Sequence, residues 1–220
     1  MASIVALGES IKKAPLIAEV LGESGPIIHL YSGVHGDEPE SVEFLTGFWK
    51  RELLENVPDN ITILYFPEVN PDGLEAGTRV NANGVDINRN FPSKNWEPKS
   101  VEKKNYPGKS PASEPETKAI MSAIDRFPPS AIISVHTWIP QVNFDGPAEN
   151  LAKIIAAKNG YVLTEHIGYP TPGSLGAFAG YYRNIQVITL ELPEHTPVSG
   201  YWERNSGALW EAIKYLEKHG

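Results

Sequence analysis

The chain contains no cysteine, and this absence excludes disulfide bonds, thiol nucleophiles and thiolate-bound metals. Any metal ion must therefore be held by histidine, aspartate or glutamate side chains. A chain without cysteine is also compatible with the reducing environment of the cytoplasm.

The chain also lacks a long hydrophobic run. No apolar stretch approaches the roughly 18 residues that a membrane-spanning helix needs. The first ten residues have no basic segment followed by a long apolar stretch and a small-residue cleavage site, so they do not resemble a secretion signal. We therefore expect a cytoplasmic protein without a membrane partner.

Basic side chains are outnumbered by acidic ones. The 220 residues include 19 Lys and Arg against 27 Asp and Glu, which gives a formal net charge of −8. Binding to nucleic acid requires clustered cations that displace counterions from phosphates. The charge balance therefore argues against a nucleic-acid partner, and the sequence does not reveal the oligomeric state.

Short apolar runs alternate with helical patterns along the chain. The runs are continuous, which is typical of strands covered on both faces. We expect strands at 16–21, 27–31, 61–66, 131–135, 161–164 and 186–190, and helices at 39–54, 114–127, 148–158 and 206–218. Ser113-Glu-Pro-Glu116 matches a capping box at the start of one helix. This order predicts a single α/β domain over residues 1–220, a three-layer α/β/α structure with a central mixed, largely parallel sheet.

Four residues at the ends of predicted strands suggest a catalytic metal site. His35-Gly-Asp-Glu38 follows one strand and His136 ends another. Two histidines and a glutamate can hold zinc and leave its fourth tetrahedral position open for water. Glu191 ends a third apolar run, where a water-activating base would be expected. His-x-x-Glu alone recurs by chance, and a histidine ending a strand is usually a core residue, so the combination carries the prediction.

Other acids and histidines compete for these roles. Glu194 follows Pro193 in a loop, and we favour Glu191 as the base because it ends the apolar strand. His29 lies inside an apolar strand and is expected in the core. His195 and His166 lie in predicted loops, where lone histidines are usually at the surface.

A series of motifs between these residues completes a family pattern. Asn70-Pro-Asp-Gly73, Arg79 and Gly84-Val-Asp-Ile-Asn-Arg-Asn-Phe-Pro92 follow His35 and Glu38 in order. From about Gly25 to Glu191, the chain resembles the zinc carboxypeptidases of the carboxypeptidase A superfamily. The resemblance implies one Zn²⁺ ion with His35, Glu38 and His136 as its ligands, and Glu191 as the general base.

The resemblance implies further roles in the site. Arg79 would polarise the scissile carbonyl and stabilise the oxyanion, while Asn88 and Arg89 would bind the free carboxylate of the residue released. Asp86 would orient a ligating imidazole, namely that of His35. Arginine suits these tasks because it stays protonated and matches a carboxylate with two hydrogen bonds.

By themselves, two short segments in the series have structural interpretations. Asn70-Pro-Asp-Gly73 is a turn in which Asp72 makes structural hydrogen bonds, and Asn83-Gly84 is a tight-turn signal.

The substrate is suggested by the region before Glu191. Tyr169 is assigned as the family's catalytic tyrosine, whereas Tyr181 and Tyr182 are interpreted as packing aromatics. The short chain and Thr171-Pro-Gly-Ser-Leu-Gly176 most resemble the bacterial murein peptide amidases of this superfamily. This resemblance implies a small peptide substrate, L-Ala-γ-D-Glu-meso-diaminopimelate, cleaved during cell-wall recycling. Ser174 and Leu175 would line the substrate pocket, and an apolar residue at 175 gives no reason to expect a preference for C-terminal Lys or Arg.

Several alternatives stay open at this stage. Arg183 or a lysine of the irregular 92–112 segment would be a partner for the distal carboxylate of diaminopimelate, an expectation from charge alone. The chain could instead be a general carboxypeptidase, a γ-D-glutamyl endopeptidase or an N-acyl amino acid deacylase. A binder of peptidoglycan fragments without catalysis is a further class, although a binder would be expected to lack a ligand, the base or the oxyanion arginine.

Overall fold

A computed structural model describes residues 2–56, 59–100, 102–165 and 167–220. In this part of the chain one sheet has the strand order β1-β2-β4-β3-β5-β8-β6-β7. The strands are β1 (Ser3–Glu9), β2 (Pro15–Leu21), β3 (Ile27–Tyr31), β4 (Thr62–Phe66), β5 (Ala131–Trp138), β6 (Gln141–Asp145), β7 (Val162–Thr164) and β8 (Gln186–Pro193). Four neighbouring pairs are parallel and three are antiparallel. The prediction of a mixed, largely parallel sheet is confirmed.

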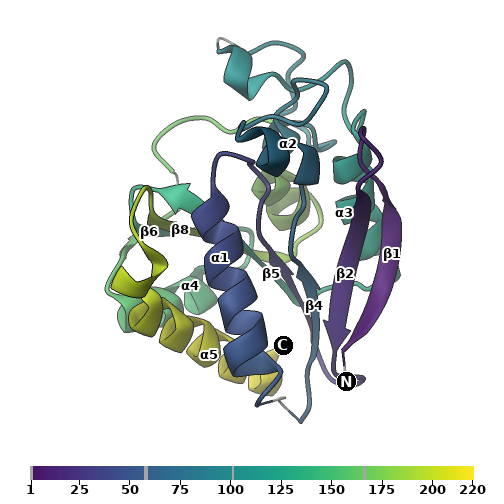
Figure 1. Cartoon of the computed structure of the whole chain (residues 1–220). Helices are drawn as coiled ribbons and strands as arrows, with labels where there is room; N and C mark the ends of the chain where they lie inside the picture. The colour runs from purple at the N-terminus through teal and green to yellow at the C-terminus, as the bar shows by residue number, and fades with distance from the viewer. Residues whose placement is uncertain (1, 57–58, 101, 166) are drawn as a thin grey trace.

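Helices cover both faces of the sheet (Figure 1). The helices are α1 (Pro39–Phe48), α2 (Pro71–Ala76), α3 (Pro115–Arg126), α4 (Glu149–Asn159) and α5 (Trp202–His219). One core packs α1, α4 and α5 against residues such as Ile28 and Leu30 of β3. The other packs α3 and the π-helical segment Gly176–Tyr182 against the opposite face, which includes Tyr31. Successive strand residues point to opposite faces, so a continuous apolar strand serves both cores.

The strand register brings the predicted site together. Strands β4, β3, β5 and β8 are adjacent and parallel, so their carboxyl ends lie at one edge of the sheet. His136 in β5 pairs directly with Glu191 in β8. The loop after β3, which carries His35 and Glu38, opens at the same edge, as expected for ligand sites in open α/β sheets.

Several elements differ from the prediction. Strand β1 is mostly exposed, β6 mixes polar with apolar residues, and α2 has only six residues, so none produces a long apolar pattern. The predicted helix at 39–54 divides into α1 and a π-helical turn, Trp49–Leu53. The predicted capping box is wrong, because the Ser113 hydroxyl bonds to the Glu114 carboxylate and no side chain caps α3.

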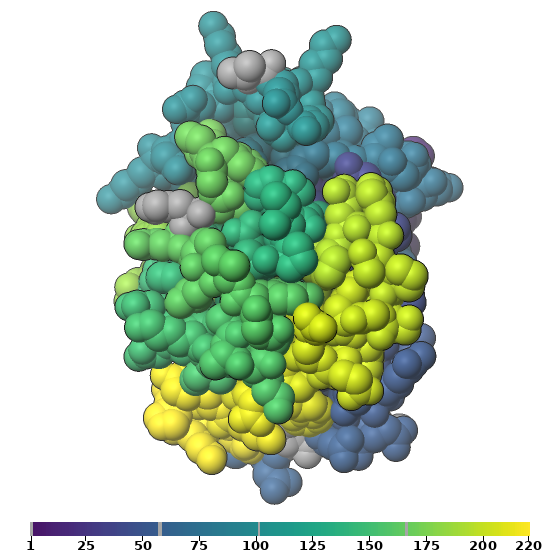
Figure 2. All heavy atoms as spheres, turned by 90° about the vertical axis from the view of Figure 1, so that its left-hand side faces the viewer, coloured from purple at the N-terminus to yellow at the C-terminus, as the bar shows by residue number. Residues whose placement is uncertain are grey.

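The long segment after residue 92 contains a single 3₁₀ turn, Lys103–Asn105, in its described part. This segment projects at the end of the molecule opposite α5 (Figures 1 and 2). The buried Asn90 side chain anchors it by donating to the carbonyls of Pro107 and Ser110 at 2.7 and 3.0 Å. None of the helices in the described ranges has the length and apolarity needed to cross a membrane.

Candidate metal centre and active-site cleft

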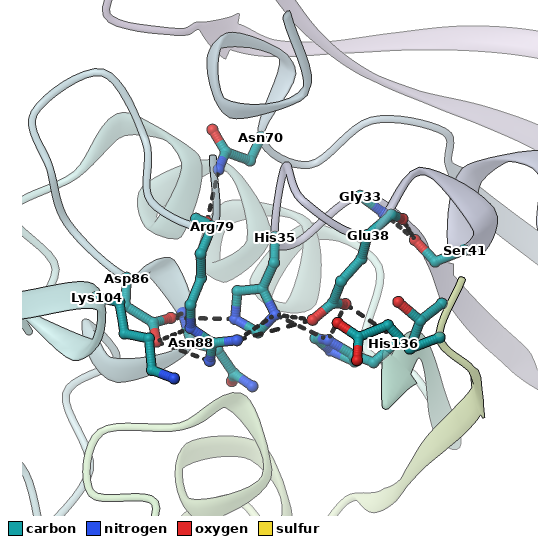
Figure 3. A network of polar contacts seen from close by, with 12 residues as sticks. Gly33, His35, Glu38, Ser41, Asn70, Arg79, Asp86, Asn88, Lys104 and His136 are labelled. Carbon is teal, nitrogen blue, oxygen red and sulfur yellow. Dashed lines mark hydrogen bonds and ion pairs between the residues drawn. The ribbon is translucent and has the colours of Figure 1, made fainter. Parts of the chain in front are cut away.

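Three buried side chains converge where β3 and β5 end. The Nδ1 atoms of His35 and His136 are 3.2 Å apart. The Glu38 carboxylate lies 2.7 Å from Nδ1 of His35 and 2.9 Å from Nδ1 of His136 (Figure 3). The three residues thus offer donor atoms at one point and could hold a metal ion.

The donor set fits zinc. Zinc binds nitrogen and oxygen ligands at about 2.0–2.2 Å in a tetrahedron, which places neighbouring ligand atoms roughly 3.4 Å apart. The three separations within the cluster are 3.2, 2.7 and 2.9 Å, so small outward shifts would reach this spacing. Imidazole nitrogen and carboxylate oxygen are also donors that zinc accepts in catalytic sites.

The outer nitrogen of each histidine also has a polar partner. Nε2 of His35 lies 3.2 Å from the Asp86 carboxylate, and Nε2 of His136 lies 3.0 Å from the Ser134 hydroxyl. A hydrogen bond at the outer nitrogen fixes the tautomer that leaves Nδ1 free for a metal. Asp86 is the predicted partner of His35. Ser134 was not predicted, although its place two residues before His136 in a strand puts both side chains on one face.

The pKa shifts in the cluster come from burial and from pairing between its acids and bases. Burial lowers the pKa of His35, but the carboxylates of Glu38 and Asp86 outweigh this effect and raise the pKa to about 9. Burial prevails at His136 and lowers its pKa. Burial acts to raise the pKa of Glu38, yet His35 and then His136 hold it well below its usual range. The carboxylates of Glu38 and Asp86 therefore stay ionised despite their burial and supply negative charge beside the two imidazoles.

Glu191 lies beside the cluster with one oxygen uncommitted. It is 5% exposed and lines the same cleft as the cluster, and its Oε2 atom has no hydrogen-bond partner among the described residues. Burial, with a smaller contribution from Glu38, raises the pKa of Glu191 to about 8. Such a carboxylate is suited to accept and return a proton. The competing Glu194 also lines the cleft, but it is exposed and follows β8 in a loop.

Arg79 reaches the cluster from the segment after α2. Its Nε and Nη2 atoms lie 3.0 and 2.9 Å from Oδ2 of Asp86, and Nη1 lies 3.8 Å from Glu38 (Figure 3). Burial acts to lower the pKa of Arg79, but Asp86 and Glu38 outweigh it and raise the pKa, so the guanidinium stays charged. A fixed cation at this place is suited to stabilise negative charge that develops on a substrate. Asp86 therefore holds both His35 and Arg79.

The residues predicted to bind the substrate lie together on one wall of the cleft. Nη1 of Arg89 donates to the Asn88 carbonyl at 2.7 Å, and Oδ1 of Asn88 accepts from the Leu175 N–H at 2.9 Å. The Ser174 hydroxyl accepts from the Ala177 N–H at 3.0 Å, near the start of the π-helical segment. The four predicted residues, Asn88, Arg89, Ser174 and Leu175, all line the cleft that contains the metal cluster.

Tyr169 stands at the rim of this cleft. It is 43% exposed, and its ring packs edge to face against Trp138 with 5.7 Å between centroids. Tyr181 and Tyr182 are more than half exposed and lie outside the cleft lining. Tyr182 packs as predicted, with 6.4 Å between its ring centroid and that of Phe178, although both tyrosines stay largely exposed. Of the three tyrosines, Tyr169 is the one that lines the cleft.

Asp145 is a cleft residue that was not predicted. It ends β6 and is half-buried among the residues that line the cleft. A Cβ atom at Gly176 would clash with the Asp145 carboxylate, and one at Gly180 would lie 2.7 Å from the Asp145 Cβ. Glycine at both positions therefore makes the room that this side chain occupies. Strand β6 alternates polar and apolar residues over only five positions, so a search for continuous apolar runs did not find it or place Asp145.

Of the basic residues predicted to bind the distal carboxylate of diaminopimelate, a lysine lines the cleft and Arg183 does not. Lys104, on the 3₁₀ turn of the 92–112 segment, lines the cleft. Arg183 is outside the lining: its guanidinium pairs with Asp125 at 2.6 Å and lies 5.0 Å over the Phe178 ring. The expectation for Arg183 is therefore wrong, because the end of the π-helical segment directs it towards α3.

The remaining expectations concern structural residues. Asp72 accepts from the Ser10 hydroxyl at 2.7 Å and the Lys12 N–H at 3.0 Å, which confirms a structural role. Gly84 has φ of +73° in the turn after Asn83, as predicted. His29 is fully buried and His195 is exposed, both as expected. His166 lies outside the described residues.

An open α/β sheet with a His–Glu–His cluster, a buried carboxylate and an arginine in one cleft defines a metal-dependent hydrolase. The chain belongs to the zinc carboxypeptidase family, whose sequence profile matches residues 1–146. Family membership confirms the predicted resemblance and the class of enzyme.

Relatives and solved structures agree with this placement. The chain is 37% identical over 201 residues to murein peptide amidase A of Escherichia coli (strain K12), covering 84% of this chain and 79% of the relative. The crystal structure of the murein-tripeptide amidase from Escherichia coli O157 has a TM-score of 0.78 at 30% identity, covering 99% of this chain and 93% of the other. Carboxypeptidase A of Helicoverpa armigera shares the fold, with a TM-score of 0.82 at 17% identity over 99% and 68% of the chains.

Proposed function

We propose that this protein hydrolyses the amide bond between γ-D-glutamate and meso-diaminopimelate in L-Ala-γ-D-Glu-meso-diaminopimelate and releases the C-terminal residue. The observation that carries the proposal is a single cleft that holds the His–Glu–His cluster, a buried carboxylate and two arginines. The 37% identity to a murein peptide amidase over most of both chains supports this choice of substrate.

In this proposal His35, Glu38 and His136 bind one zinc ion. Zinc held there would act as a Lewis acid that lowers the pKa of a water molecule and polarises the scissile carbonyl. Asp86 and Ser134 keep the two imidazoles oriented through the contacts at their outer nitrogens.

In this proposal Glu191 transfers the proton and Arg79 stabilises the negative charge that develops during the reaction. Glu191 accepts a proton from the attacking water and passes it to the leaving amine, a task for which its uncommitted Oε2 atom is available. Arg79 donates hydrogen bonds to the oxygen of the scissile carbonyl as negative charge develops there. Because Asp86 fixes two of its nitrogens, the guanidinium is oriented before the substrate arrives.

Asn88 and Arg89 bind the free α-carboxylate of the residue that is released. A γ-linked amide that precedes such a residue presents the same groups as an ordinary C-terminal peptide bond, so the roles of the cleft residues are unchanged. Ser174 and Leu175 shape the pocket beside Asn88, and Tyr169 contacts the bound peptide from the rim.

Asp145 and Lys104 favour diaminopimelate as the residue released. Its side chain ends in an amino group and a carboxylate, which suit an acid and a base in the same cleft. We expect Asp145→Asn to raise KM for the murein tripeptide roughly 10-fold, because a hydrogen bond between charged groups contributes about 1.5–3 kcal/mol. Steady-state kinetics measures this. A tripeptide ending in 2-aminopimelate, which lacks the distal amino group, is the matched control, and equal effects on both peptides would argue against an ammonium partner.

Product analysis tests the function itself. The zinc-loaded protein is incubated with the murein tripeptide, the same tripeptide ending in lysine, and an α-linked peptide, and the products are identified by mass spectrometry. We expect free diaminopimelate from the first peptide alone. Cleavage of the α-linked peptide would identify a general carboxypeptidase instead, and no cleavage of any peptide would favour an endopeptidase, a deacylase or a binder.

We also propose that residues 1–220 form one catalytic domain acting in the cytoplasm on peptides recovered from the cell wall. The single sheet and the absence of cysteine support this setting.

A further inference from the structure

Asn70 is fully buried at the start of α2, between the loop that carries His35 and the segment that carries Arg79. Its main-chain N–H donates to the Gly33 carbonyl at 2.8 Å, and its Oδ1 atom accepts from the Gly73 N–H at 2.9 Å. Its Nδ2 atom donates to the main-chain carbonyl of Arg79 at 3.4 Å (Figure 3). One residue thus connects the helix start to two segments of the active site.

Two glycines allow these segments to pack in direct contact. A Cβ atom at Gly36 would clash with the main chain of Gly73, and one at Gly73 would clash with the Asn70 amide. The metal-ligand loop, the start of α2 and the Asn70 side chain are therefore packed without room for wider side chains. In such an interior, a change at one contact is transmitted to its neighbours.

The main chain at Arg79 has few other supports. Residues 75–78 are exposed. Within the described ranges, the Asn70 amide makes the one hydrogen bond to the Arg79 main chain. Asp86 holds the guanidinium at the other end of the side chain. Asn70 thus holds the main chain of Arg79, and Asp86 holds its guanidinium.

We infer that Asn70 is a positioning residue for Arg79. It does not contact the substrate; it holds the main chain from which the guanidinium reaches the scissile carbonyl. Loss of its N–H donor would let the Arg79 main chain move away from α2 and would misplace the guanidinium. This inference rests on the role of Arg79 in the proposed function.

The variant Asn70→Asp separates the two tasks of the side chain. Aspartate is as good an N-cap residue as asparagine, so the oxygen that caps α2 is retained. The N–H donor becomes an oxygen that repels the Arg79 carbonyl. We expect kcat to fall about 10- to 100-fold, with KM changed less than about 2-fold and zinc content unchanged. The affinity for a phosphinic peptide that mimics the tetrahedral intermediate should fall by the same factor as kcat/KM. This binding measurement does not require turnover.

Asp72→Asn is the matched control in the same helical turn. Asp72 bonds to Ser10 and Lys12 but not to Arg79, so this variant should lose thermal stability and keep the wild-type kcat. If Asn70→Asp does not fold, Asn70→Ser supplies a capping oxygen without the repulsive charge and is measured in its place.

A double-mutant cycle with Arg79→Ala decides the inference. If Asn70 acts through Arg79, adding Asn70→Asp to Arg79→Ala causes no further loss of phosphinate affinity. Independent, additive losses would overturn the inference about Asn70 alone, as would wild-type kcat in a folded Asn70→Asp protein. Undiminished activity and phosphinate affinity in Arg79→Ala itself would overturn the proposed role of Arg79 and the inference together.

Discussion

Replacement of Glu191 by glutamine is expected to lower kcat by about 10²- to 10⁴-fold, the range that general acid–base catalysis contributes. Glutamine keeps the shape of the side chain but cannot accept a proton. Glu191 is not one of the three predicted metal ligands, and glutamine fills the same buried space, so we expect the fold and zinc content to persist. Steady-state kinetics with metal analysis of the same samples measures both.

Glu194→Gln is the matched control, because it makes the same chemical change three residues further along the chain. Glu194 lines the cleft but is exposed in the loop after β8, so its loss should change kcat less than about 3-fold if Glu191 is the base. The reverse outcome, with Glu194→Gln inactive and Glu191→Gln active, would move the base to the loop. Comparing the two variants therefore shows which glutamate is the general base, and not only that the reaction requires a general base.

Much of the site could be predicted from the sequence because its residues end apolar runs or lie in the loop that follows one. His136 and Glu191 each lie at the end of a continuous apolar run, and parallel neighbouring strands place such ends at one edge. The spacing of the two residues in the sequence could not predict that they lie side by side. The register of β5 with β8, which sets His136 beside Glu191, depends on packing between residues about 55 positions apart.

The side of the cleft away from the metal was harder to predict. Asp145 ends β6, a five-residue strand in which polar and apolar residues alternate and which pairs antiparallel with β8. Arg183 was expected in the cleft on charge alone, but charge does not determine direction: the π-helical turn points it at Asp125. Local sequence patterns therefore predicted where buried strands end. The positions of side chains that depend on tertiary contacts could be seen only in the structure.

The elements that could be predicted from the sequence are those with long, continuous apolar runs. Strands β3, β5 and β8 are buried on both faces, and their continuous apolar runs identified them. Strand β1 at the edge of the sheet buries little, so its sequence resembles an exposed segment. The missed elements are an exposed edge strand, the alternating strand β6 and the six-residue helix α2, and none of them carries a residue of the metal cluster.

Removal of the metal is expected to abolish activity and to lower the thermal midpoint, with zinc restoring both. The ligand set exists only in the folded chain, so bound metal stabilises it by about 4 kcal/mol when free zinc is 1,000 times its dissociation constant. For a domain of this size that corresponds to roughly 8–16 °C in the thermal midpoint. Dialysis against a chelator, metal analysis, peptide hydrolysis and thermal unfolding before and after zinc addition provide the measurement.

His136→Ala should reproduce the metal-free state even with zinc present, because one of three ligand atoms is gone. His195→Ala is the matched control, since His195 is exposed in the loop after β8 and outside the cleft lining. Retained activity after verified metal removal would contradict the zinc mechanism. A stable, zinc-binding but inactive wild-type protein would instead point to a ligand-binding role, because the cluster would hold metal without the chemistry that Glu191 and Arg79 are placed to perform.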